Sequence, residues 1–143
     1  ESKAPDFQLT QFDGSEFRLS SQAGENLVVL NFWYPTCPPC REEMPSFEAA
    51  WLRLQADAAN IKFLGFFVPQ GFDSEQDARD FVAELGLTYG FATDISAQVA
   101  KMFQIEVYPT TVFIDVSGRV FKTQISVLDE EKIISIVREM SGG

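Results

Sequence analysis

The sequence predicts an α/β fold, a mixed β-sheet with helices on both faces. Two apolar, β-prone runs at 27–34 and 61–68 are separated by a long segment of helical periodicity, which is typical of parallel strands joined by a crossover helix. Two further β-prone runs flank a turn at 116–119 and predict a hairpin, whose strands are antiparallel. A sheet with both kinds of pairing is mixed, and the helices between strands cover its faces.

The N-terminal third of the chain predicts a hairpin, a buried strand and a long helix. Residues 4–19 alternate around a turn at 13–14, as in a short β-hairpin. The run 27–34 is nearly all apolar, which favours a central strand buried on both faces. A helix is expected to open near Cys37 and to be kinked by its internal Pro45. Its apolar positions recur at the helical period: Met44, Phe47, Trp51 and Leu54.

The remaining elements follow in order from 61 to the C-terminus. The expected strands are 61–68, 89–92, 110–115 and 120–125, and the expected helices are 74–85, 95–103 and a last one after Asp129. Ser74 and Asp129 are the expected N-caps, because their side-chain oxygens accept hydrogen bonds from the free N–H groups of a first turn. The expected apolar stripes are Phe81, Val82 and Leu85 in the second helix, and Ile133, Ile136, Val137 and Met140 in the last.

Length and composition fit a single domain over residues 1–143 and exclude several functions. The 143 residues are 45% hydrophobic and 22% charged, as in ordinary globular proteins. The net charge of −10 disfavours nucleic acid and anionic lipid as partners. The chain has no histidine, which excludes Ser-His-Asp triads, Cys-His nucleophile pairs and His-bound metals. Two cysteines alone cannot complete a four-ligand zinc site.

Cys37 and Cys40 are the two cysteines of the chain and lie three residues apart at a strand-to-helix junction. A disulfide at this spacing closes so short a loop that it would add little stability. The helix N-terminus stabilises a thiolate, so a redox role fits better than a pair of buried small hydrophobic residues. Cys37, on an exposed lip, is the expected nucleophile, and Cys40 is expected to resolve the mixed disulfide. The redox group would be this disulfide, without a separate cofactor.

Six short segments match a known family over nearly the whole chain. They are 4–7 (APDF), 31–33 (NFW), 37–41 (CPPCR), 43–45 (EMP), 108–111 (YPTT) and 113–115 (FID). With these segments the sequence resembles the thioredoxin-like TlpA/ResA/DsbE group. The resemblance implies a thioredoxin fold with an N-terminal β-hairpin and a central helix–strand insertion. It also implies that Pro109 is cis and faces the dithiol, and that Tyr108 offers its backbone to a substrate chain.

The residues expected to bind substrate are Tyr108, Pro109, Trp33, Thr36, Pro38 and Pro39. Trp33 fits core filling and packing beside the dithiol equally well. Thr36 departs from the group's pattern, which usually has Trp directly before the nucleophilic cysteine. Pro38 and Pro39 remove two N–H donors that could have bonded the Cys37 thiolate, so the candidate donors are the N–H groups of Cys40 and Arg41. We therefore expect a reduction potential nearer about −270 mV than about −120 mV.

The resemblance does not identify a proton acceptor for Cys40, because this chain lacks the acids that related proteins have. Thioredoxins proper have a buried Asp where this chain has Asn31, and the group's acid after the second strand falls at Gln70, which cannot titrate. Asp73 and Glu75 lie nearby in sequence and are weak substitutes. Glu42 and Glu43 are interpreted as first-turn charges that complement the helix dipole.

The resemblance implies an extracytoplasmic thiol–disulfide oxidoreductase that reduces disulfides in client proteins, such as apocytochrome c or metal-site cysteines. It also implies a membrane thiol–disulfide electron donor, and a location in the periplasm or at the outer face of the cytoplasmic membrane. A leader or an anchor before Glu1 would fit this location.

Three alternatives differ in chemistry. One is an oxidant of the same fold that installs disulfides. Another is a peroxiredoxin-like peroxidase, whose reactive cysteine follows a Pro by seven residues and a Thr or Ser by three. Cys37 has Leu30 and Tyr34 there instead. A copper-delivery protein would need a histidine ligand, which this chain lacks.

Overall fold

The computed structural model describes residues 2–57 and 60–142 of the chain. Its strands are β1 (Gln8–Thr10), β2 (Glu16–Arg18), β3 (Leu27–Trp33), β4 (Ile61–Phe67), β5 (Gly90–Thr93), β6 (Thr110–Ile114) and β7 (Val120–Gln124). Its helices are α1 (Pro38–Asp57), α2 (Glu75–Leu85), α3 (Gln98–Met102) and α4 (Glu130–Gly142), with 3₁₀ turns η1 (Leu19–Gln22) and η2 (Ile95–Ala97). No helix in the described part of the chain is long and apolar enough to cross a membrane.

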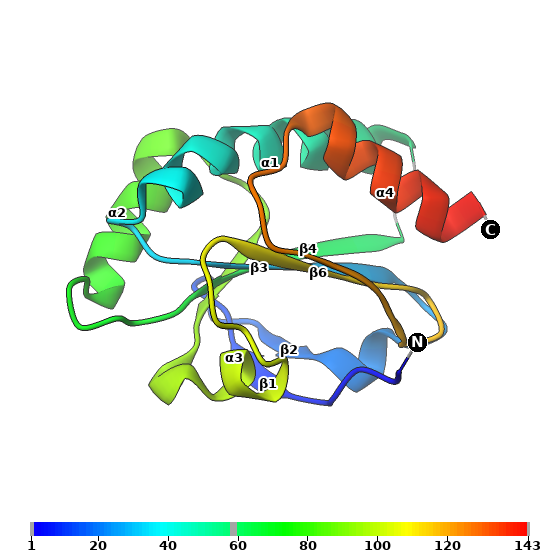
Figure 1. The fold of residues 1–143 in the computed structure, drawn as a ribbon, viewed down its shortest axis with the longest axis horizontal. Coiled ribbons are helices and arrows are strands. Elements are labelled where there is room, and N and C mark those ends of the chain that lie inside the picture. The colour runs from blue at the N-terminus through cyan, green and yellow to red at the C-terminus, as the bar shows by residue number, and fades with distance from the viewer. Residues whose placement is uncertain (1, 58–59, 143) are drawn as a thin grey trace.

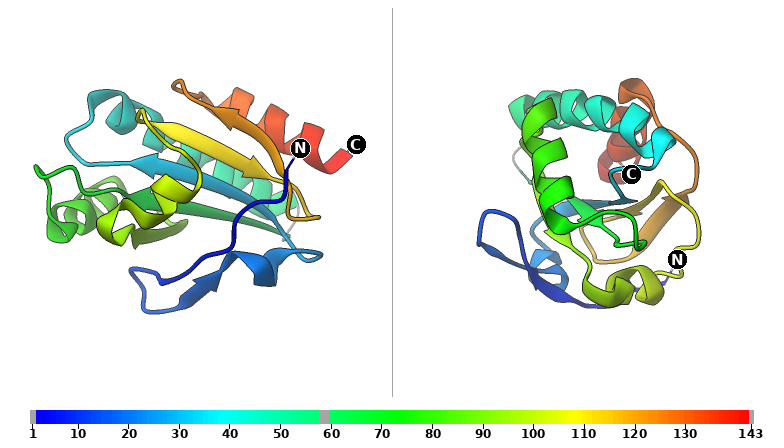
Figure 2. Two further views of the ribbon diagram at one scale, coloured as in Figure 1. Left: turned by 60° about the horizontal axis from the view of Figure 1, so that its bottom comes forward. Right: turned by 90° about the vertical axis from the view of Figure 1, so that its left-hand side faces the viewer.

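The main sheet of the described residues has the order β5-β4-β3-β6-β7 and is mixed, as predicted. β3 runs parallel to β4 and antiparallel to β6. Figure 1 shows α1, α2 and α4 on one side of this sheet, and the β1–β2 hairpin with α3 on the other. Two further views in Figure 2 show the same layers, and this is the expected thioredoxin fold with its N-terminal hairpin.

The alternation of β3 divides the core into two clusters, one on each face of the sheet. Val29 and Trp33 pack with residues of α1, α2 and α4, whereas Leu30 and Phe32 pack with the hairpin and α3. Because successive side chains of a strand point to opposite faces, a strand covered on both sides is apolar throughout. This explains why 27–34 is apolar at nearly every position, with Asn31 as the polar exception.

Helices α1 and α2 form largely as predicted. α1 continues through Pro45 to Asp57, and of its expected stripe Trp51 alone is only partly buried. In α2, Ser74 and Asp77 form a reciprocal capping box. The prediction that Leu85 belongs to the buried stripe is wrong, since it is 42% exposed. The helix ends there at left-handed Gly86, and the chain turns so that Leu87 is buried instead.

The continuous helix predicted over 95–103 is wrong, because it is broken into η2 and α3. Ser96 and Ala97 adopt left-handed backbone angles, with φ of 58° and 55°. Buried Asp94 accepts hydrogen bonds from the N–H groups of Val99 and Ala100 at 2.8 Å each, so its carboxylate holds the start of α3. The last helix meets its prediction, since Asp129 accepts from the N–H of Lys132 at 2.8 Å and the expected stripe is buried.

Gly65 marks the closest packing beneath the site, and its replacement by alanine is expected to destabilise the fold. A Cβ at this position would lie 2.5 Å and 2.7 Å from ring carbons of Phe91 and 3.3 Å from Nε1 of Trp33. Overpacking of this kind costs about 1–3 kcal/mol, which urea unfolding of Gly65→Ala would measure. Gly142→Ala is the matched control, because its Cβ meets nothing within 4 Å. Equal midpoints for the two variants would contradict this packing.

Candidate active site

The cysteine pair lies where β3 leads into α1 and forms a disulfide between Cys37 and Cys40. The N–H of Cys40 donates to Sγ of Cys37 at 3.3 Å. The N–H of Arg41, the other candidate donor, bonds the backbone oxygen of Cys37 at 3.0 Å instead. A single backbone donor therefore reaches this sulfur among the hydrogen bonds that the described residues make, since Pro38 and Pro39 supply none.

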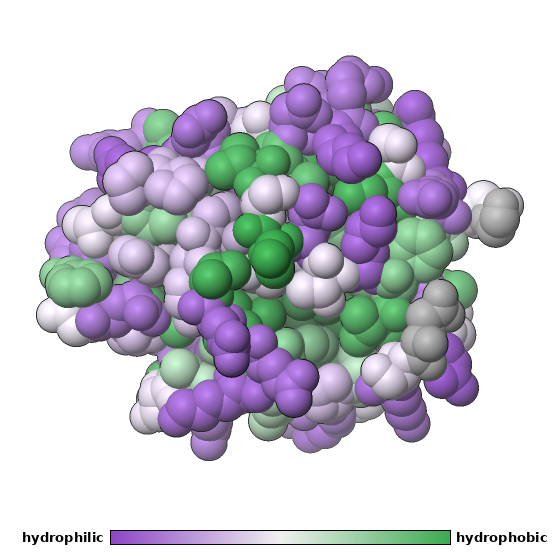
Figure 3. All heavy atoms as spheres, in the orientation of Figure 1, coloured by the Kyte–Doolittle hydropathy of each residue, from purple (hydrophilic) through white to green (hydrophobic). Residues whose placement is uncertain are grey.

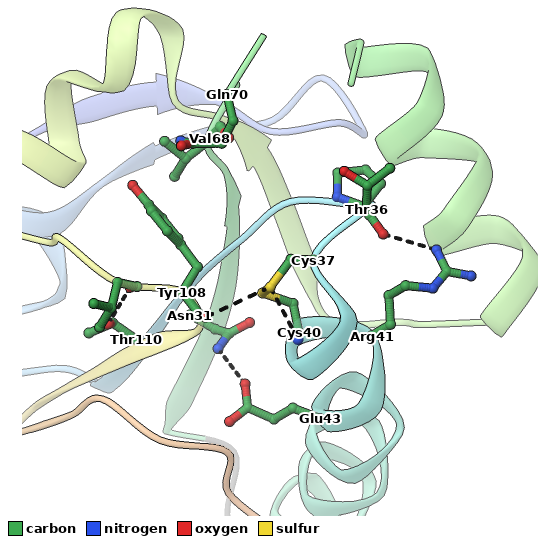
Figure 4. The surroundings of a disulfide bond; sticks show 12 residues. Asn31, Thr36, Cys37, Cys40, Arg41, Glu43, Val68, Gln70, Tyr108 and Thr110 are labelled. Atoms are coloured by element: carbon green, nitrogen blue, oxygen red, sulfur yellow. Dashed lines mark hydrogen bonds between the residues drawn. A yellow bond between two sulfur atoms is a disulfide. The ribbon is translucent and has the colours of Figure 1, made fainter. Parts of the chain in front are cut away.

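Cys37 is more covered than the sequence suggested. It was expected on an exposed lip, but it is 2% exposed and Cys40 is 0% exposed. The reason is the chain at Tyr108, whose backbone oxygen lies 3.8 Å from Sγ of Cys37 (Figure 4). The Tyr108–Pro109 bond is cis, as the resemblance implied. The backbone of Tyr108 is thus part of what covers this sulfur.

The other residues expected to bind substrate divide into an exposed rim and a buried support. Thr36, Pro38 and Pro39 are exposed around Cys37. Trp33 is 0% exposed and packs against Phe67, Phe81 and Phe91. In this structure Trp33 is thus a core residue beneath the dithiol, and it offers no surface to a partner.

The two weak substitutes for the proton acceptor are engaged elsewhere. Asp73 accepts hydrogen bonds from the N–H of Thr36 at 3.1 Å and from its Oγ1 at 2.9 Å. Glu75 accepts from Oγ1 of Thr93 at 2.6 Å and from Arg79, and these hydrogen bonds hold the pKa of its carboxyl below the usual value against the effect of burial. These hydrogen bonds of the two carboxylates lead to Thr36, Thr93 and Arg79, and none of them leads to Cys40.

Glu43 is the functional candidate that sequence reasoning missed. It was interpreted as a first-turn charge, but it is 1% exposed. Its Oε1 accepts from Nδ2 of Asn31 at 3.0 Å, and its Oε2 accepts from the N–H of Leu128 at 2.8 Å. Burial raises the pKa of Glu43 from 4.5 to about 7, opposed by these hydrogen bonds from Leu128 and Asn31. A group with this pKa exchanges protons at neutral pH.

The position of Glu43 along α1 could have revealed its burial. Cys40, Glu43, Met44 and Phe47 are all buried and recur at the helical spacing. A glutamate three residues after Cys40 lies on the same helix face, next to the cysteine. Figure 4 shows Glu43 and Asn31 on the same side of the disulfide. Charged residues are seldom fully buried, and those that are buried cluster at functional sites.

Asn31 joins the acid to the sheet. Its Nδ2 donates both to Glu43 and to Oγ1 of Thr111 at 3.1 Å. Asn31 is 1% exposed and Thr111 is 0% exposed, so this polar cluster is cut off from bulk water. Asn31 cannot accept a proton as an aspartate would, and within this cluster Glu43 is the group that titrates.

Exposed apolar side chains gather on the face beside the cis peptide bond. In Figure 3, hydrophobic atoms lie over the start of β6 and the segment that leads to α4. Val107, Ile125 and Val127 of these segments are 47%, 67% and 40% exposed. Such a surface beside a reactive sulfur is suited to contact with a polypeptide.

The chain is similar in sequence and in fold to several known proteins. The model of the AhpC/TSA family matches residues 1–123. The thiol-disulfide oxidoreductase ResA of Geobacillus thermodenitrificans is 32% identical over 132 residues, which cover 92% of this chain and 72% of that protein. Sporulation thiol-disulfide oxidoreductase A of Bacillus subtilis is 23% identical over 127 residues, 89% and 74% of the two chains. A thiol:disulfide interchange protein from Chlorobium tepidum has a similar structure, with a TM-score of 0.85, 23% identity and coverage of 97% and 95%.

Proposed function

Since the chain belongs to the AhpC/TSA family and is a thiol–disulfide oxidoreductase of the ResA type, we propose that its reduced Cys37–Cys40 pair reduces disulfides in client proteins. The observation that carries this proposal is the arrangement of Cys37, Cys40 and Glu43. A disulfide at a helix N-terminus has the buried carboxyl of Glu43 on the helix face of Cys40.

The first step is attack by the Cys37 thiolate on one sulfur of the client disulfide. A bond forms between Sγ of Cys37 and that sulfur, the client's own S–S bond breaks, and the other client sulfur leaves as a thiolate that takes a proton from water. The N–H of Cys40, which points at Sγ of Cys37, stabilises the attacking thiolate.

The second step releases the client and oxidises the enzyme. Cys40 gives its proton to the Glu43 carboxylate and attacks Sγ of Cys37, so that the Cys37–Cys40 bond forms and the client leaves as a second thiolate. Two electrons pass from the pair to the client, and a dithiol donor must restore them. The pKa of Glu43, about 7, supports its assignment as the proton acceptor.

The client chain is proposed to lie along the rim of the site. Tyr108 would pair its backbone with the client, and Pro109 would sit opposite the dithiol. Thr36, Pro38 and Pro39 would contact the client from the other side of Cys37. Trp33 would act by packing under the dithiol, because its burial supports no direct contact.

The direction and location of the reaction are part of the proposal. The single N–H that bonds Cys37 supports a reductant rather than an oxidant, because a weakly stabilised thiolate leaves the dithiol form less favoured. The likeness to ResA supports an extracytoplasmic location, a membrane thiol–disulfide donor, and clients such as apocytochrome c or metal-site cysteines. The net charge of −10 favours basic clients.

Reduced protein mixed separately with insulin and with hydrogen peroxide tests this proposal. We expect release of insulin thiols together with oxidation of Cys37 and Cys40, and peroxide consumption no faster than that of a simple thiol. Rapid peroxide consumption with intact insulin disulfides would identify a peroxidase instead, the activity that Leu30 and Tyr34 argue against.

A further inference from the structure

Three aromatic rings form a continuous strip beside the dithiol. The rings of Tyr108 and Tyr34 have centroids 5.6 Å apart, and those of Tyr34 and Phe72 have centroids 6.3 Å apart. We call Tyr108, Tyr34 and Phe72 the aromatic strip. Tyr108 and Tyr34 are partly buried, whereas Phe72 is 73% exposed. A large aromatic side chain with this exposure has little to gain from the fold alone.

The exposed end of the strip is tied to the active-site loop. Phe72 lies in the segment between β4 and α2, and the next residue, Asp73, accepts two hydrogen bonds from Thr36. Thr36 directly precedes Cys37. The contact thus holds Phe72 at a set place relative to the reactive sulfur, although the two lie 35 positions apart in sequence. An exposed aromatic side chain that is held in one place is a common anchor of a binding surface.

The chemistry of the site determines what covers this strip. In a mixed disulfide the client sulfur lies about 2.05 Å from Sγ of Cys37. Sγ of Cys37 itself lies 3.8 Å from the backbone oxygen of Tyr108. The client residues next to the bonded cysteine must therefore run beside Tyr108, where the strip begins. An extended chain advances about 3.3 Å per residue. The distances between successive rings of the strip are 5.6 and 6.3 Å, so client residues two to four positions from the bonded cysteine would lie over Tyr34 and Phe72.

We propose that the aromatic strip selects its substrates: extended polypeptides with an aromatic side chain two to four residues from the reactive cysteine, bound against Phe72 and Tyr34. This inference rests on the proposed function, since it names the substrate class of the same site. Phe72 is then a specificity-determining residue, and Asp73 is a positioning residue that acts through Thr36.

Matched peptide disulfides test this assignment. Each probe is a symmetric disulfide of a Gly/Ser peptide with a central cysteine, carrying Phe four residues before it, Phe four residues after it, or Ser at both places, because side chains four residues apart in an extended chain share a face. Second-order rate constants for reduction are divided by each protein's rate with hydroxyethyl disulfide, so that changes in thiol reactivity cancel. We expect one Phe peptide to react about 3- to 10-fold faster than the Ser peptide, the size of an aromatic pair.

Phe72→Ala is expected to bring this ratio to about 1, and Asp73→Ala to lower it by releasing the loop. Ile95→Ala is the control, because Ile95 is equally exposed at 73% and takes no part in the ring contacts of the strip, and it should keep the full ratio. A ratio near 1 in the unmodified protein, or an unchanged ratio in Phe72→Ala, would overturn the inference while leaving the proposed function intact. A loss of the ratio in Ile125→Ala but not in Phe72→Ala would overturn it as well.

Two further outcomes separate the inference from its premise. If the unmodified protein reduces neither hydroxyethyl disulfide nor any peptide, the proposed function fails first. If sedimentation shows a dimer that Phe72→Ala dissociates, the strip is covered by a second copy of the chain, and the inference is wrong. We expect a monomer in both proteins.

Discussion

Replacing Cys40 by serine is expected to yield a protein that remains joined to its clients as a mixed disulfide. Cys37 can still attack a disulfide, but no second thiol then breaks the bond that forms. Incubating reduced Cys40→Ser with excess insulin should therefore add the mass of one insulin molecule, because one broken disulfide leaves the two insulin chains joined by the other. Mass spectrometry under non-reducing conditions measures this directly.

Cys37→Ser is the matched control, with a single thiol left at the buried position. It should form no such adduct and should reduce no insulin, since Cys40 is 0% exposed. Adducts on Cys37→Ser and none on Cys40→Ser would reverse the assigned order of the two cysteines.

Replacing Glu43 by glutamine is expected to slow client release by about 100-fold at pH 7, the usual contribution of a well-placed proton acceptor. In the unmodified protein, release should accelerate as pH rises through about 7, where Glu43 becomes a carboxylate. In Glu43→Gln the rise should move toward about 8.5, the ordinary pKa of a thiol. Single-turnover reduction of a peptide disulfide between pH 5.5 and 9 measures both profiles.

Glu43→Gln is also expected to change how the stability of the folded protein depends on pH. The folded pKa of Glu43 is raised from 4.5 to about 7, so the folded protein holds this proton more tightly than the unfolded chain. Stability should therefore fall as pH rises from about 4.5 to about 7 and stay level above, by a total of about 3 kcal/mol for this group. Urea unfolding of Glu43→Gln should lack that fall.

Glu42→Gln is the neighbouring control, because Glu42 is exposed. It should keep both the rate profile and the pH dependence of stability. If Glu42→Gln and Glu43→Gln behaved alike, the loss would come from the charge of the helix N-terminus, and Glu43 would not be the proton acceptor.

The sequence predicts most of the fold because its signals there are local. The run at β3 reports burial on both faces, and Ser74 and Asp129 each cap the helix that follows them. The break at Ser96 and Ala97 had no such signal, since neither residue type favours the left-handed region. It depends on Asp94, whose side chain bonds N–H groups five and six residues further along.

In the active site, too, some residues could be predicted from local motifs and others could not. The cysteines and Pro109 stand in motifs that can be read directly, whereas Glu43 and Phe72 depend on what packs around them. Glu43 is buried by Asn31 and Leu128, which come from other parts of the chain. Phe72 is held by Asp73 through Thr36, a contact across 37 positions. The helical spacing from Cys40 is a signal that Glu43 is buried, but no local pattern in the sequence identifies partners this distant.

The equilibrium reduction potential of the Cys37–Cys40 pair tests the central claim most directly. Alkylation would count free thiols across a series of redox buffers at pH 7. A value near about −270 mV is expected, because one backbone N–H stabilises the Cys37 sulfur and the two prolines supply none. A value near about −120 mV would contradict the account, since the pair would then install disulfides in its clients rather than reduce them.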